Sequence, residues 1–432
     1  MPFVNIEHFI ANRIAFSQGK SFTRTIIRFT IASVALSIAV IILTSAVITG
    51  FKNEITEKIF GFWGHIDVTH NTIRRNFEAV PFEQDAAFID TIKAIEQVTI
   101  ERYDEDGSGA TYQVSSSEGI KHVQAICLLP AIIKTKKDFE SIIMKGVGKD
   151  FDWSNLESFI IDGRRIEFPD SSASDDILIS EVTSRRLSLE VGQSIIVTFL
   201  RNREQIPRKF TVSGIYKTGL EEYDKRFALV DMKEIQQVFG WKDNQVMGLE
   251  VFVDDIEELR LINEYVNHYT LPGYMYSETV RDKFPAIFSW LELQNINEYV
   301  ILILMTVVTI INMITALLIL ILERSQMIGV LKSIGSSNWS IRKIFLYQAI
   351  HIIKWGLIIG NIVGLAICFI QAKFKVIKLN EENYYLSSAP IEVDPVRIIL
   401  LNVAVVVIIL LFLVIPTYLI SRISPVKVLH FK

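Results

Sequence analysis

The chain has 432 residues, half of them hydrophobic, a formal net charge of −4 and a mean hydropathy of +0.34. This average is too apolar for an ordinary soluble enzyme of this length. The two cysteines, Cys127 and Cys368, fall in a predicted soluble domain and in a predicted membrane span, so we expect no disulfide between them.

Four apolar stretches predict membrane spans. A bilayer core about 30 Å thick needs ~20 apolar residues per helix. Phe29–Phe51 carries no charged side chain, and its apolar core is longer than that of a cleaved signal peptide. We expect transmembrane helices over residues 29–51, 299–322, 346–372 and 398–421.

Basic side chains beside the spans predict the orientation. Lysine and arginine exceed acidic residues before residue 29, in the loop 323–345 and in the tail 422–432. By the positive-inside rule these three segments face the cytoplasm. The loop 373–397, with four basic and four acidic residues, is then extracytoplasmic. We expect a multi-pass membrane protein with both termini in the cytoplasm.

Residues 52–298 predict a large soluble domain between the first and second spans. This segment has 42 acidic and 28 basic side chains, which argues against a nucleic-acid partner and against adhesion to anionic lipid. Runs rich in β-branched residues, such as 194–200, alternate with amphipathic helices, such as 231–240 and 255–269. We therefore expect an α-helical membrane protein with four transmembrane helices and a large α+β periplasmic domain of two lobes.

Two further patterns predict helices that pack or lie on a surface. Residues 1–28 begin with an amphipathic pattern typical of an interfacial helix on the cytoplasmic side. Gly356, Gly360 and Gly364 repeat every four residues in the third span. Small residues in such a row allow the backbones of two membrane helices to approach closely. We expect these glycines to form a helix-packing face.

Motifs for common catalytic chemistry are absent from the sequence. There is no phosphate-binding G-x-x-x-x-G-K-[ST] loop, no G-x-S-x-G nucleophile motif and no H-E-x-x-H zinc helix. His65 and His70, on a predicted strand, are five residues apart and point to opposite faces, so we expect structural roles for them. The chain is predicted to be neither an enzyme nor a holder of a cofactor or metal.

The cytoplasmic loop 323–345 predicts a helix, a turn and a second helix. Met327, Val330, Leu331 and Ile334 recur at helical spacing and form one apolar face. Gly335 can adopt the left-handed conformation that ends a helix. A membrane-surface helix and a docking helix for a cytoplasmic protein both fit this pattern.

The same loop resembles a known family. "ERSQMIGVLKSIGSSNWSIRKIF" (323–345) is similar to the E-R-x-x-x-I-G-x-L-K-x-x-G signature of FtsX-like ABC transporter permeases. Residues 47–68, residues 209–230 and the "SPVKVL" tail resemble the transmembrane subunits of the lipoprotein-releasing system (LolC/LolE type). The resemblance implies a MacB-like periplasmic core domain over 52–298.

The resemblance also implies partners and a mechanism. In this family a separate cytoplasmic ATPase dimer binds ATP and Mg²⁺, and its movement is passed through the spans to the periplasmic domain, a process called mechanotransmission. A second permease subunit, the same or a related chain, completes the membrane part. An acylated lipoprotein leaves the membrane lipid for a periplasmic carrier. The implied ATPase-coupling residues are Glu323, Arg324, Met327, Ile328, Gly329, Leu331, Lys332 and Gly335.

A lipoprotein cavity between two permeases would have an apolar lining from the first two spans. Helical spacing suggests Val40, Leu43, Val47, Ile310, Met313 and Leu317 for this lining. Packing within the core of the chain explains the same six residues equally well.

A second function stays open at this point. An FtsX-like regulator would pair with an ATPase to activate a cell-wall hydrolase without moving a substrate. The large outer domain and the segments "GFWGHI" (61–66) and "TGLEEYD" (218–224) favour lipoprotein release.

Overall fold

The computed structural model describes residues 21–72, 80–103, 111–135, 138–154, 156–170, 172–201, 203–418 and 420. The chain divides into two compact units. We call residues 21–53, 290–378 and 388–420 the helical unit, and residues 54–289 and 379–387 the mixed unit. Most of the expected amphipathic helix over 1–28, and the tail 422–432, lie outside the described residues.

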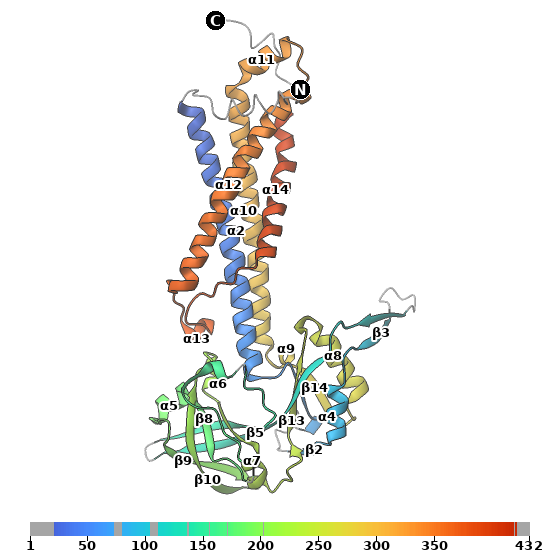
Figure 1. The fold of residues 1–432 in the computed structure, drawn as a ribbon, viewed down its shortest axis with the longest axis vertical. Helices are drawn as coiled ribbons and strands as arrows, with labels where there is room; N and C mark the ends of the chain where they lie inside the picture. The colour runs from blue at the N-terminus through green and yellow to red at the C-terminus, as the bar shows by residue number, and fades with distance from the viewer. Residues whose placement is uncertain are drawn as a thin grey trace. The chain divides into compact units, whose positions relative to one another are not determined.

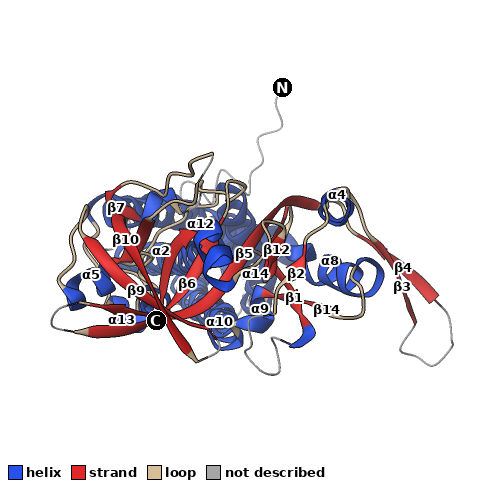
Figure 2. Ribbon diagram, turned by 90° about the horizontal axis from the view of Figure 1, so that it is seen from below, coloured by secondary structure: helices blue, strands red, loops and turns tan. Residues whose placement is uncertain are grey.

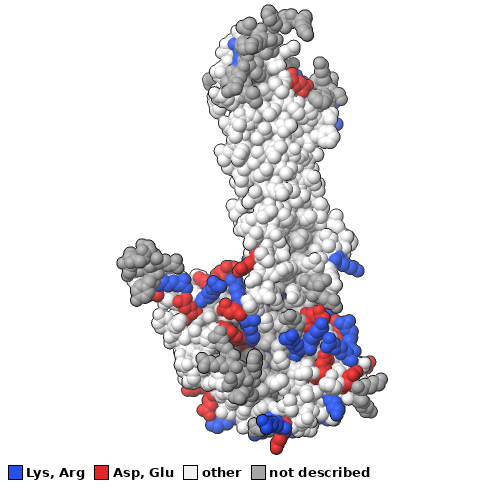
Figure 3. Space-filling model, turned by 180° about the vertical axis from the view of Figure 1, so that it is seen from behind, with Lys and Arg blue, Asp and Glu red and all other residues white. Residues whose placement is uncertain are grey.

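Four long helices dominate the helical unit (Figure 1). Within the described chain, each is long and apolar enough to cross a membrane. Lys, Arg, Asp and Glu are nearly missing from most of the helical unit on the face in Figure 3, as lipid contact requires. The helices are α2 (Ser21–Phe62), α10 (Pro285–Glu323), α12 (Asn338–Phe374) and α14 (Pro395–Thr417).

The helix bounds differ from the predicted spans because helices continue beyond the apolar stretches. The first continues to Phe62 and the second begins at Pro285, so both extend well past residues 29–51 and 299–322. The fourth ends at Thr417, one residue after Pro416, which removes a backbone donor from the last turn. Two short helices lie between the long ones: α11 (Ser325–Ser333) between α10 and α12, and α13 (Glu381–Tyr384) between α12 and α14.

The predicted loop 373–397 is divided between the two units. Its middle part, residues 379–387, belongs to the mixed unit. Glu381 pairs with Nζ of Lys217 at 3.0 Å, and the carbonyl of Tyr385 accepts a hydrogen bond from Nζ of Lys58 at 3.2 Å. The loop therefore contributes to the fold of the mixed unit.

The mixed unit is built on one large mixed sheet, which has ten strands among the described residues (Figure 2). The strand order is β14–β1–β13–β5–β6–β11–β8–β10–β7, and β9 pairs with both β10 and β5. The strands are β1 (Ile66–His70), β5 (Ile120–Lys134), β6 (Phe139–Val147), β7 (Ile160–Gly163), β8 (Asp176–Ser180), β9 (Ser194–Arg201), β10 (Glu204–Tyr216), β11 (Phe227–Asp231), β13 (Gly248–Val253) and β14 (Met275–Thr279).

Shorter elements surround this sheet. Strands β3 (Thr99–Tyr103) and β4 (Thr111–Ser115) form a hairpin that extends away from the rest of the mixed unit (Figure 2). Strands β2 (Phe82–Glu83) and β12 (Gln245–Val246) pair separately. The helices are α4 (Ala86–Lys93), α5 (Glu181–Leu187), α6 (Glu221–Asp224), α7 (Met232–Phe239), α8 (Leu259–Tyr265) and α9 (Val280–Lys283), with short turns η1 (Glu157–Phe159), η2 (Ile256–Glu258) and η3 (Val266–Thr270).

Burial explains why the central strands are almost entirely apolar. Every residue of β8, β11 and β13 is buried, whereas β9 alternates between exposed and buried positions because only one of its faces meets the core. One apolar core runs along the sheet. The two lobes expected from the sequence share this sheet and this core.

Local sequence explains where the helices of the mixed unit begin and end. The Asp231 carboxylate accepts a hydrogen bond from the backbone N–H of Lys233 at 3.0 Å and caps α7. Gly240, at φ +69°, ends the same helix in the left-handed conformation. The polar segment 169–176 is only partly exposed, because Ser174 and Asp176 are buried beside Asp231 and Arg164.

Candidate functional site

The segment after α10 forms a helix, a tight turn and a second helix. After α11 ends, the N–H of Gly335 donates to the carbonyl of Lys332 at 3.0 Å and the N–H of Ser336 donates to that of Leu331 at 3.0 Å. This pair of bonds is the Schellman motif, and Gly335 at φ +96° supplies the left-handed residue that it needs. Ser337 then caps α12 by accepting from the N–H of Ser340 at 3.2 Å.

The apolar residues of α11 divide between two faces. Ile328 is fully buried in the core of the helical unit, and Met327 and Leu331 pack against that core. Val330 and Ile334 face outward, with 44% and 76% of their surface exposed. The predicted single apolar stripe is therefore split, because the chain's own helices cover one side of it.

The remaining predicted coupling residues take different positions. Gly329 is buried on the inner side of α11, and Arg324 occupies the N-cap position of this helix. Nζ of Lys332 donates to the carbonyl of Ile420 at 2.7 Å, so this lysine contacts its own chain. Glu323 and Gly335 are exposed.

The glycines of α12 face α2 at close range. A Cβ on Gly356 would lie 2.6 Å from Val34, and a Cβ on Gly360 would lie 2.7 Å from the carbonyl oxygen of Ala35. Gly364 is less tight, with its nearest neighbour, Cα of Ala39, at 3.1 Å. The close approach of the α12 and α2 backbones therefore requires residues without a side chain at these positions.

The six residues suggested for a cavity lining differ in burial. Ile310, Met313 and Leu317 are buried in the core of the helical unit. Leu43 packs partly against that core, and Val40 and Val47 are half-buried. For the three residues on α10, packing within the chain is what the structure shows.

An ion pair that the sequence reading missed joins three of the long helices. Nη2 of Arg397, at the start of α14, donates to both carboxylate oxygens of Glu298 on α10, each at 2.7 Å. Nη1 of Arg397 donates to Oγ1 of Thr49 on α2 at 2.8 Å. Glu298 is almost fully buried. Each charge stands at the edge of an apolar run, which is the only sign of this contact in the sequence.

The segment before α14 crosses α2 at Gly50. The N–H of Glu392 donates to the carbonyl of Ala46 at 3.0 Å, and Nδ2 of Asn53 donates to the Glu392 carboxylate at 2.7 Å. A Cβ on Gly50 would lie 2.9 Å from the Glu392 nitrogen. The crossing therefore depends on a glycine at this position.

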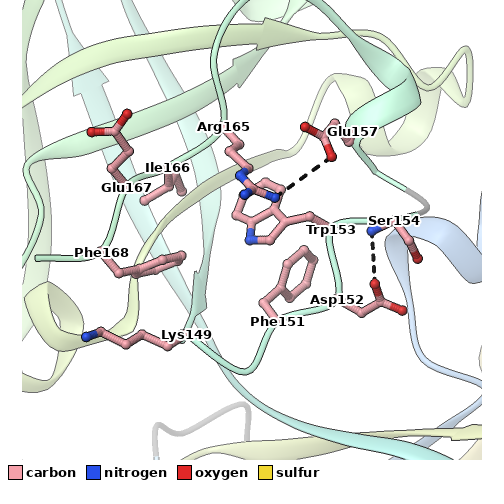
Figure 4. A pocket seen from close by; sticks show the side chains of 10 residues that line it. All are labelled: Lys149, Phe151, Asp152, Trp153, Ser154, Glu157, Arg165, Ile166, Glu167 and Phe168. Atoms are coloured by element: carbon pink, nitrogen blue, oxygen red, sulfur yellow. Dashed lines mark hydrogen bonds and ion pairs between the residues drawn. The ribbon is translucent and has the colours of Figure 1, made fainter.

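The mixed unit has an open pocket of about 750 Å³ beside β6 and β7 (Figure 4). The rings of Phe151, Trp153 and Phe168 face its centre, with Phe151 and Trp153 packed edge to face at 5.0 Å. Arg165 pairs loosely with Glu157 at 3.8 Å at the rim. The charged side chains among its described lining residues are exposed or half-buried.

The histidines of the mixed unit have structural contacts. Nδ1 of His65 accepts a hydrogen bond from the N–H of Val253 at 3.0 Å, and its ring packs against Phe60 and Phe252. Burial, with a smaller effect of the Lys121 charge, lowers the pKa of His65 to about 4. Within the described part of the chain, no group of three or more His, Cys, Asp or Glu side chains could hold a metal ion.

Two protein-family models match this chain. The MacB-like periplasmic core domain matches residues 29–259, and the FtsX-like permease C-terminal domain matches residues 299–425. The chain belongs to the FtsX-like permease family, with a MacB-like periplasmic core domain. Together the two matches include most of the four long helices and every strand of the large sheet except β14.

Curated relatives of this FtsX-like permease match it along nearly its whole length. The lipoprotein-releasing system transmembrane protein LolC of Xylella fastidiosa is 22% identical over 93% of both chains. The corresponding protein LolE of Haemophilus influenzae is 20% identical over 94% of both chains. Among solved structures, the extracellular domain of the ABC-type transporter YknZ from Gram-positive bacteria matches 50% of this permease and 99% of its own chain, at 16% identity and a TM-score of 0.29.

Proposed function

We propose that this FtsX-like permease is the membrane subunit of an ABC transporter that extracts lipoproteins from the inner membrane and passes them to a periplasmic carrier. Similarity along more than nine-tenths of the chain to LolC and LolE is the observation that carries this proposal. The chain itself would bind no cofactor, and ATP and Mg²⁺ would bind to a separate cytoplasmic ATPase.

The proposed orientation places the mixed unit in the periplasm and both termini in the cytoplasm. The excess of lysine and arginine in 323–345 and in the tail supports this assignment.

The outward face of α11 is the proposed contact with the ATPase. Val330 and Ile334 supply the exposed apolar surface, whereas Leu331 and Met327 connect α11 to the core of the helical unit. A partner that pushes on the outer face would move the long helices through the inner face. A helix that has one face on the partner and the other on the long helices fits mechanotransmission. A helix whose apolar residues all dock on the partner would have no such connection to the long helices.

A second permease, the same or a related chain, is the proposed partner within the membrane. An apolar strip of α10 is exposed along several turns, and it can meet lipid or another helix. The half-buried residues Val40, Leu43 and Val47 remain candidates for the lining of a lipoprotein cavity. The strip consists of Leu293, Ile296, Val300, Ile303, Val307 and Ile311.

Two charge substitutions test the ATPase contact. We expect Val330→Glu and Ile334→Glu to abolish co-purification of the ATPase with the permease, because a carboxylate replaces apolar surface that the contact would bury. Val330→Ile and Ile334→Leu keep that surface apolar and should retain the partner. Retention of the ATPase by both glutamate variants would contradict the assigned face.

Depletion in cells separates the proposal from its alternative. Loss of a lipoprotein-releasing permease should leave lipoproteins in the inner membrane fraction. Loss of an FtsX-like activator of a cell-wall hydrolase should instead produce chains of undivided cells with lipoproteins sorted normally, and that result would favour the regulatory function.

A further inference from the structure

Two carboxylates lie directly opposite each other on neighbouring strands of the mixed unit. Asp67 of β1 is in register with Glu250 of β13, which is in register in turn with Gln124 of β5. All three are buried, and Nε2 of Gln124 donates to Oε2 of Glu250 at 2.7 Å. Like charges that face each other in a sheet repel. Nearby cations would offset this repulsion.

Two lysines supply these cations. Nζ of Lys145, on β6, lies 2.6 Å from Oε1 of Glu250, and both side chains are completely buried. Lys283, in α9, forms an ion pair with Asp67, and its ammonium group lies 3.7 Å from the centroid of the Trp63 ring. The four charged groups therefore form one cluster in which each carboxylate has its own cation; three of them are buried and Lys283 is partly exposed.

The cluster also contacts the chain at the end of α2 and just before α10. Nζ of Lys145 donates to the backbone carbonyl of Phe62, the last residue of α2, at 2.5 Å. A cation is favoured there because the carbonyl end of a helix dipole is negative. Lys283 lies two residues before Pro285, where α10 begins. Within the mixed unit, one cluster thus ties the ends of two long helices to β1, β6 and β13.

Aromatic rings enclose the same helix end. Phe62 stacks on Tyr223 with ring centroids 5.6 Å apart and an angle of 6°, and Trp63 meets Phe227 edge to face at 5.2 Å. A Cβ on Gly64 would lie 2.6 Å from Cβ of Glu250. These contacts bring the sequence segments 61–66 and 218–224 together around the end of α2.

Stability alone does not explain the charges. Replacing a buried ion pair with apolar side chains of similar volume is often neutral or stabilising. Nε1 of Trp63 and Oδ1 of Asp67 are, in addition, buried with no hydrogen-bond partner among the described residues, which costs free energy. What the ion pairs do supply is a fixed direction and distance between Lys145, Glu250 and the Phe62 carbonyl.

We propose that Lys145 is a positioning residue that, together with Glu250, fixes the end of α2 to β6 and β13, so that a displacement of α2 moves the sheet of the mixed unit. This inference rests on the proposed function, since it assigns residues to the step that passes motion to the periplasmic domain. An apolar replacement would keep the core filled but would leave the helix end free to slide against the strands.

The double variant Lys145→Met/Glu250→Leu tests this inference in the complete complex with the ATPase and a second permease in lipid. Three quantities are measured: thermal midpoint, lipoprotein released per ATP hydrolysed, and the ATP-dependent change in hydrogen exchange of 139–147 and 248–253. We expect a thermal midpoint close to that of the unmodified complex. The amount of lipoprotein released per ATP should fall by a factor of roughly ten or more, because small misplacements of functional groups commonly have effects of this size. The ATP-dependent change in hydrogen exchange should be lost.

A matched control removes another ion pair from the same strand. Nη1 of Arg186, on α5, lies 2.6 Å from Oε1 of Glu140, near the start of β6. Arg186→Met/Glu140→Leu should keep the release ratio and the exchange response. An equal loss in this control, or an unchanged response in the Lys145 variant, would overturn the inference.

Two further outcomes are decisive. If the apolar double variant does not fold, Lys145→Gln/Glu250→Gln removes both charges and keeps polar contacts, and the same loss is expected. If the unmodified complex releases no lipoprotein, the proposed function fails, whereas the hydrogen exchange still decides the inference: no ATP-dependent change in 139–147 and 248–253 would overturn it.

Discussion

At the scale of single residues, three buried charges of the mixed unit, Asp67, Lys145 and Glu250, lie where the chain leaves α2. Burial lowers the pKa of Lys145, and the nearby carboxylates of Glu250 and Asp67 oppose this shift. The ammonium group therefore depends on its partners to stay charged. A lysine inside the apolar strand "SIIMKGV" and a glutamate inside "GLEVFV" were visible in the sequence, but their distance was not, because 105 residues separate them.

Single substitutions in this pair should be more harmful than the double one. Lys145→Met leaves the Glu250 carboxylate buried without its cation, and breaking a buried pair in this way costs about 3–5 kcal/mol. The thermal midpoint of the full chain in detergent should fall clearly in Lys145→Met and recover in Lys145→Met/Glu250→Leu. A double variant as unstable as the single one would show that the pair itself stabilises the fold.

His65 should make the stability of the mixed unit depend on pH. Its pKa is about 4 in the folded protein, below the ordinary value of 6.5 that applies when unfolded. The unfolded chain therefore binds the extra proton as the pH falls from about 6.5 to about 4, so the stabilisation is complete above this window and is lost through it. The loss amounts to about 3 kcal/mol.

His65→Asn provides the comparison, because an amide oxygen can still accept from the Val253 N–H without titrating. The thermal midpoint should fall less between pH 7 and pH 4.5 in the variant than in the unmodified chain. Equal falls would mean that other groups account for the acid sensitivity.

At the scale of elements, the closest packing in the helical unit is that of α12 on α2. Gly360→Leu would force side-chain atoms into the space of the Ala35 carbonyl and Ile38, and such overpacking costs about 1–3 kcal/mol or more. Ala366→Leu adds the same group at an exposed position of α12. Only the glycine variant should lower the thermal midpoint, and an equal effect of both would contradict the packing.

The elements themselves could largely be predicted, because periodicity and capping are local. The turn at Gly335, the end of α7 at Gly240 and the strand at 194–201 all follow from residues within a few positions of each other. The division of α11 into an inner and an outer face could not be predicted in this way. It depends on which of its apolar residues meet helices distant in the sequence.

At the scale of the whole molecule, the long helices follow from local sequence, whereas the strand order of the mixed unit does not. Apolar runs, free of Lys, Arg, Asp and Glu except for Lys354 in the third, predict the membrane-spanning parts of the four long helices. Strand order is not local: β5 pairs with β6, β9 and β13, and residues 379–387 join the mixed unit through Lys58 and Lys217. The sequence likewise does not predict the ion pair between Arg397 and Glu298, because each residue lies at the polar end of a different span.

The proposed function requires the two units to act together with partners. The family and the full-length relatives support a permease that moves lipoproteins, and the described geometry adds a split coupling helix and a buried cluster at the end of α2. The decisive measurement is reconstitution of the permease with its ATPase in vesicles that contain an acylated lipoprotein, with a soluble carrier outside. ATP should transfer the lipoprotein to the carrier, and Ile334→Glu should prevent it; ATP hydrolysis by the complex with no soluble lipoprotein would contradict the account.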